Sequence, residues 1–182
     1  MTKEFVPGRL DVRSFAEAAA ALSDDEPLRS YQRLHAELVD PPEDLVVHWQ
    51  AFGQSRSGVD GTLVPWLHLT AQTRVPLVCQ RCLSPVDVDL QVDRWFRFVA
   101  DEATAAQEDE EAEEDVLVAS RDFNLHGLVE DELLMEIPVT PRHEVCPQPM
   151  PLSAADPEFE AAEADRPNPF AVLGVLRSDR SK

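Results

Sequence analysis

The sequence predicts an α+β fold: an antiparallel β-sheet core with N-terminal helices, one late helix and an acidic insert. Three observations support this fold class. Apolar and polar residues alternate with a period of two across residues 45–100, helical periodicity flanks this region on both sides, and the loops between the alternating segments are too short for helical crossovers. Hydrophobic residues make up 43% of the 182 positions, which is enough to build a core.

Residues 13–39 are predicted to be helical. Ser14, with Glu17 three residues later, forms a capping-box pattern before an alanine-rich run. A second helix is expected to begin near Asp25, with Pro27 in its first turn, and the tandem prolines at 41–42 should end it because proline lacks the amide donor.

The sheet is expected from residue 45 onward. A first strand leads into a polar loop at 53–61, and a long strand covers 63–78. Residues 86–93 alternate between valine or leucine and aspartate or glutamine, which is typical of a strand with one face in water.

The acidic insert, residues 101–115, contains nine acidic residues and no basic one. Like charges four residues apart, as at Glu110 and Glu114, oppose a helix, so we expect a solvated loop. A docking surface for a basic partner is the alternative. A short strand at 116–119 should follow, and then a helix capped by Asn124.

Three regions are expected along the chain. Residues 1–40 form an N-terminal helical segment, and 41–146 form the sheet domain with the CxxC motif and the acidic loop 101–115. Residues 147–182 form a proline- and acid-rich linker followed by a short C-terminal helix, which either folds back or docks onto a partner.

Charge and composition exclude several classes of protein. A net charge of −19 argues against a simple polyanion binder and against adhesion to an anionic membrane. No segment is apolar enough to span a bilayer, the N-terminus does not resemble a signal peptide, and three cysteines do not make a disulfide framework. We therefore expect no membrane partner and a cytoplasmic location.

Four residues form a candidate metal site. Cys79 and Cys82 have the spacing with which two thiolates hold one metal, and His143 and Cys146 repeat that spacing. Together they would make a Cys3His zinc site. Two alternatives remain: a pair of half-buried thiols in a turn, and a redox pair, although the helix N-terminus that activates redox thiols is missing here.

A candidate RNA-binding surface lies in the predicted sheet. Residues 45–100 carry five arginines against four aspartates, a charge of +1, so the remainder of the chain carries −20. Arginines and aromatic residues on a sheet can hold phosphates and stack on bases. The candidate RNA contacts are Arg74, Arg81, Arg94 and Arg97. Core packing is the alternative for the tryptophans of this region.

Enzyme signatures are missing from the sequence. There is no GxSxG, HExxH or phosphate-binding glycine loop. The histidines at 35, 48, 68 and 126 have no cysteine or serine partner at a recognisable local spacing. We predict no catalytic residues.

Four segments in this order resemble the bacterial YceD family, the large ribosomal RNA subunit accumulation proteins. They are VCQRCLSP at 78–85, DFNLHGLVEDE with its continuation at 122–139, HEVC at 143–146, and PNPFAVL at 167–173. The resemblance spans roughly 40–176. Some family members have a fuller second cysteine pair where this chain has His143 and Cys146. The histidine either replaces a cysteine as a metal ligand or marks a lost site.

The resemblance implies a non-enzymatic ribosome biogenesis factor that supports synthesis, processing or stability of 23S ribosomal RNA. Its expected partner is a ribosomal RNA precursor or an assembly intermediate. The alternative is an acidic chaperone or docking protein for a basic ribosomal protein, with indirect effects on the RNA. The cofactor is unknown, with zinc as the candidate.

Overall fold

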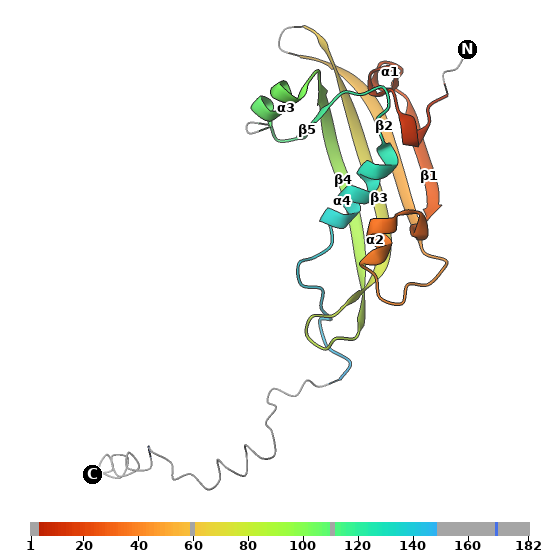
Figure 1. Cartoon of the computed structure of the whole chain (residues 1–182), viewed down its shortest axis with the longest axis vertical. Helices are drawn as coiled ribbons and strands as arrows, with labels where there is room; N and C mark the ends of the chain where they lie inside the picture. The colour runs from red at the N-terminus through yellow and green to blue at the C-terminus, as the bar shows by residue number, and fades with distance from the viewer. Residues whose placement is uncertain (1–3, 59–60, 110–111, 149–169, 171–182) are drawn as a thin grey trace. The chain divides into compact units, whose positions relative to one another are not determined.

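The computed structural model describes residues 4–58, 61–109, 112–148 and 170. The chain divides into two units, Met1–Cys146 and Pro147–Lys182. In the first unit, a five-stranded sheet in the order β1-β2-β3-β4-β5 carries three of its helices, α1, α2 and α4, on one face (Figure 1). The predicted linker and C-terminal helix of the second unit lie almost wholly outside the described residues. No helix in the described part of the chain is long and apolar enough to cross a membrane.

Three long strands form the centre of the sheet, as the alternation predicted. They are β2 (Val46–Ser57), β3 (Leu63–Val78) and β4 (Pro85–Val99), and each pairs antiparallel with the next. The predicted loop at 53–61 is shorter than expected, because β2 continues through Ser57 and pairs with the start of β3.

The N-terminal region contains a strand where a helix was expected, so that prediction was wrong in part. After a 3-10 turn (Pro7–Arg9), α1 covers only Val12–Glu17, capped by Asp11. Ala19 then adopts a positive φ of 45°, and β1 (Ala21–Pro27) pairs antiparallel with β2. A second 3-10 turn (Leu28–Ser30) and α2 (Gln32–Ala36) follow. The exposed backbone edge of β2 offers hydrogen bonds that outweigh the helix propensity of alanine.

The acidic insert also differs from its prediction, because it contains a helix. Helix α3 (Glu102–Glu108) begins at Asp101, whose carboxylate accepts a hydrogen bond from the Thr104 amide at 2.9 Å. Arg97 forms ion pairs with Glu108 and Glu114. Arg97 thus offsets the negative charge at the end of α3 and at Glu114 beyond it, while the Glu110–Glu114 spacing lies past the last residue of the helix. The insert leads into β5 (Asp115–Val118), which pairs parallel with β4, so the sheet is mixed rather than wholly antiparallel.

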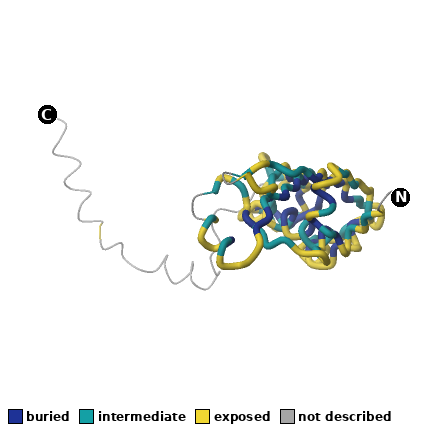
Figure 2. The backbone as a smooth tube through the Cα atoms, turned by 90° about the horizontal axis from the view of Figure 1, so that it is seen from above, coloured by how far each residue is buried: buried dark blue, intermediate teal, exposed yellow. Residues whose placement is uncertain are grey.

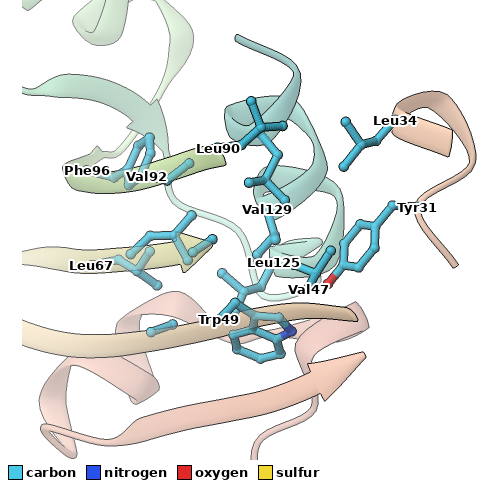
Figure 3. Close-up of a cluster of buried hydrophobic side chains, with 14 of the residues drawn as sticks. Tyr31, Leu34, Val47, Trp49, Leu67, Leu90, Val92, Phe96, Leu125 and Val129 are labelled. Atoms are coloured by element: carbon cyan, nitrogen blue, oxygen red, sulfur yellow. The ribbon is translucent and has the colours of Figure 1, made fainter. Parts of the chain in front are cut away.

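Helix α4 (Leu125–Met135) covers the centre of the sheet, with Asn124 as its predicted cap. Leu125, Val129 and Leu133 have no exposed surface and belong to the main apolar cluster. Figure 3 shows Leu125 and Val129 against side chains of the central strands, among them Val47, Trp49, Leu67, Leu90 and Val92. In Figure 2, the buried residues lie inside the first unit and the exposed residues lie around them. The face of the sheet under α4 is called the covered face below.

Candidate metal centre and open sheet face

The first cysteine pair lies in the turn that joins β3 to β4. The Leu83 amide donates to the Cys79 carbonyl at 2.8 Å, and the Cys79 amide donates to the Ser84 carbonyl at 3.0 Å. Leu83 closes this turn with a positive φ of 58°. The turn therefore holds both thiols at one end of the sheet, beyond the apolar core.

The second pair reaches this turn from the segment after α4. The Gln80 amide donates to the Pro141 carbonyl at 2.8 Å, and the Arg81 guanidinium donates to the His143 carbonyl at 2.5 Å. Cys82 Sγ and His143 Nδ1 are 3.4 Å apart. One donor atom from each of Cys79, Cys82, His143 and Cys146 lies within 4.8 Å of the other three. The structure thus brings together the four predicted ligands from two segments about sixty residues apart.

The surroundings of the four groups favour thiolate at the first pair. Burial by itself raises the pKa of Cys79, but backbone amides of Cys82, His143 and Arg81 donate to its sulfur and bring the pKa down to about 5. A hydrogen bond from the Ser84 hydroxyl lowers the pKa of Cys82. Burial raises the pKa of Cys146, and hydrogen bonding to Cys79 raises that of His143.

The donor set fits a tetrahedral zinc ion. Cysteine and histidine in Cys3His combinations are common structural zinc ligands, and sulfurs around one zinc lie about 3.8 Å apart at ordinary bond lengths. The observed spread of up to 4.8 Å is close to that spacing, and Cys79 is buried while its three neighbours are half-buried. A closed site with four protein ligands leaves no open position, which is the pattern of a structural rather than a catalytic zinc.

The four arginines predicted to contact RNA do not share one surface. Arg74 lies beside Asp87 and Asp89 at 3.5 and 3.8 Å, with its side chain 65% exposed. Arg81 binds the loop that carries His143, as described above. The other two, Arg94 and Arg97, hold helices to β4.

Arg94 projects from the covered face. It lies opposite the buried Leu69 in the strand register, and its guanidinium contacts Glu132 of α4 and the C-cap residue Glu136 at 3.2 and 3.1 Å. Arg97 lies on the opposite face, where Glu108 and Glu114 hold it. The expectation that one sheet surface presents all four arginines is therefore corrected: three residues of separation on a strand place Arg94 and Arg97 on opposite faces.

The face opposite α4 is called the open face, and two of the three tryptophans lie there. Trp49 is 2% exposed in the core, as the packing alternative predicted. Trp66 and Trp95 instead lie half-buried on the open face, with ring centroids 6.4 Å apart. The Arg56 guanidinium lies over both rings, 4.2 and 4.1 Å from their centroids. The sequence analysis missed Arg56 in this role, although its face follows from the alternation of β2.

A comparison with known proteins identifies the family. Residues 67–177 match the family described as "Large ribosomal RNA subunit accumulation protein YceD". A Haemophilus influenzae protein of that same name is 33% identical over 111 residues, which cover 58% of this chain and 62% of the relative. The matched part thus spans less than two thirds of that relative's length. No solved structure was matched.

Proposed function

This chain belongs to the YceD family of large ribosomal RNA subunit accumulation proteins, and on that premise we propose that it supports the accumulation of 23S ribosomal RNA in the cytoplasm without catalysing a reaction itself. The family match carries this proposal. Two features support it: the described residues form a closed structural-type Cys3His cluster, and the open face bears aromatic and amide side chains.

The experiment is deletion of the gene in its own organism, followed by measurement of 23S relative to 16S ribosomal RNA. We expect the ratio to fall and to recover when the full chain is supplied again. An unchanged ratio in the deletion strain would end the proposal.

The proposed cofactor is one zinc ion held by Cys79, Cys82, His143 and Cys146. Zinc would join the β3–β4 turn to the segment after α4, because each of these elements supplies two ligands. Bound there, the ion supplies coordination that holds the fold and no reaction chemistry.

Elemental analysis of the purified full chain tests the zinc site. We expect about one zinc per chain, since four ligands complete one tetrahedral ion. His143→Ala should lose most of the metal, whereas His35→Ala, at an exposed position in α2, should keep it. A metal-free wild-type chain purified without chelator would count against the site.

Direct RNA contact through arginines is proposed at Arg74 and Arg81. In Arg94 and Arg97, binding to a phosphate would have to break ion pairs with α4 and α3. Arg74→Glu should weaken crosslinking to precursor RNA, and Arg9→Glu, at an exposed arginine paired with Asp122, is the matched control. Equal crosslinking of the two variants would remove Arg74 from the proposal.

A docking site for a basic ribosomal protein is the second candidate function. The observation that favours it is that all four predicted arginines already contact carboxylate or carbonyl oxygens of this chain. Binding to RNA phosphates would have to compete with these contacts. Removal of 101–115 should then abolish a salt-sensitive protein complex. If the complex survives the removal of 101–115, this segment is not the docking site and has only a structural role.

A further inference from the structure

The open face carries side chains in rows that run across the strands. In antiparallel pairs, directly opposite residues project to the same side, so the strand register defines these rows. An aromatic row joins Phe52, His68 and Trp95. An amide row joins His48, Gln72 and Gln91, with Gln50 and Thr70 lying between the two rows.

The aromatic row contains one stacked pair of rings and keeps accessible surface. The rings of His68 and Trp95 are 4.4 Å apart and within 12° of parallel. Phe52 is 39% exposed, and the His68 side chain is 29% exposed. Asp93 holds His68 by a 2.6 Å hydrogen bond, so the imidazole is positioned before any ligand arrives. Partly exposed aromatic rings on a sheet are a surface on which flat ligands stack.

The amide row supplies hydrogen-bonding groups beside that stack. A shallow groove of about 800 Å³ runs over the open face, and Gln50, Gln72 and Gln91 line it with Thr70. Each glutamine offers both a donor and an acceptor, as the edges of nucleic acid bases also do. A base lying in the groove could therefore be both stacked and hydrogen-bonded.

Charge decides which ligand suits this face. Its strands carry three arginines, at 56, 74 and 97, and four aspartates, at 25, 87, 89 and 93. Glu108 and Glu114, which pair with Arg97 there, bring the formal charge of the face to −3 within a chain of −19. This is a moderately negative surface on a strongly anionic protein. A duplex, which is recognised largely through its phosphates and 2′-hydroxyls, would gain little here, whereas unpaired bases present π-faces and polar edges.

A protein partner fits the groove less well. The cores of protein interfaces are apolar, whereas most of the residues that line this groove are polar or charged: glutamine, threonine, serine, histidine and three aspartates. Phe52 is the one exposed large hydrophobic side chain of the rows described here.

We propose that the open face binds unpaired bases of an RNA strand, which stack on the Phe52–His68–Trp95 row and hydrogen-bond to Gln50, Gln72 and Gln91. This inference rests on the proposed function and names its ligand class. Arg56, placed over the two indoles, stiffens the stack and supplies the nearest cation for a phosphate.

The test is fluorescence anisotropy of the full chain with an unstructured, labelled RNA dodecamer and with a duplex of the same sequence. Single-strand binding should exceed duplex binding and depend weakly on salt, because few phosphates are neutralised. His68→Ala and Gln72→Ala should each weaken single-strand binding about five-fold or more. About five-fold is the smallest loss of affinity expected when one base contact is removed. His35→Ala and Gln32→Ala, which make the same changes in α2, should stay within about two-fold of wild type.

Two results would overturn the inference. One is unchanged single-strand affinity in both open-face variants when their thermal unfolding matches wild type. The other is release of the RNA by an equimolar lysine-rich peptide that binds the same face, which would make a protein the ligand. Failure of the gene deletion to lower 23S RNA would instead remove the proposed function, while the anisotropy result would stand by itself.

Discussion

The covered face of the sheet and the Cys3His end are held together by different forces. Under α4, burial of apolar side chains such as Leu125 and Leu133 stabilises the packing. At the Cys3His end, the segment after α4 has exposed side chains at Val139 and Val145, and hydrogen bonds tie it to the turn where the four donor atoms converge. The contrast shows that a segment without a core can be fixed by a few directed contacts. The local stability of such a region should change when metal is removed, whereas the stability of the core should not.

The largest effect is expected in the core of the covered face. Leu133→Ala removes a side chain with no exposed surface, and lost transfer energy plus a cavity should cost about 2–5 kcal/mol of unfolding free energy. Urea unfolding measures it. Met135→Ala is the control on the same helix, because Met135 is 66% exposed, and its cost should be below about 1 kcal/mol. Equal costs would mean that α4 does not cover the sheet as described.

The next effect concerns the ion pair that joins α2 to α4. Burial raises the pKa of Glu130, but the Arg33 guanidinium and the amides of Arg33 and Leu34 outweigh it and lower the pKa below the ordinary value of 4.5. This stabilisation is therefore complete above the ordinary pKa and is lost as the pH falls through the lower, folded-state value.

Glu130→Gln should remove about 1–3 kcal/mol at neutral pH, because a buried charged acceptor with three donors is lost. It should also flatten the acid limb of the stability–pH curve. Asp131→Asn, at the half-exposed second partner of Arg33, should cost less than about 1 kcal/mol. An unaltered acid limb in Glu130→Gln would contradict the assigned pKa direction.

Metal removal should affect the Cys3His end locally. A chelator, or Cys82→Ser, should speed amide exchange at Gln80, whose N–H binds the Pro141 carbonyl, and expose 137–146 to protease. Core amides of β3, such as that of Leu69, should keep their protection. Loss of protection in both places at once would show that the two regions unfold as one unit.

The smallest effect is expected at an exposed ion pair. Arg9 and Asp122 are 3.0 Å apart with side chains 79% and 67% exposed, and solvent screens such pairs. Arg9→Ala should lower the unfolding free energy by less than about 1 kcal/mol, as measured by urea unfolding. A cost as large as that of Glu130→Gln would mean that exposure does not govern the strength of these pairs.

The sequence by itself determined the central strands, α4 and the four metal-ligand candidates. Period-two alternation, the Asn124 cap and the repeated two-residue ligand spacing are local signals that any chain with these residues carries. Family resemblance followed from the same kind of local pattern and was confirmed by the family match.

Only the tertiary structure decided β1, α3 and the grouping of the arginines. Strand β1 depends on a free edge of β2, and α3 depends on Arg97 reaching Glu108 and Glu114. Arg94 is fixed to the covered face by carboxylates of a helix about forty residues away. Such long-range hydrogen bonds and ion pairs are not encoded in any short window of sequence, since they exist only once distant segments have been brought together by the burial of the core.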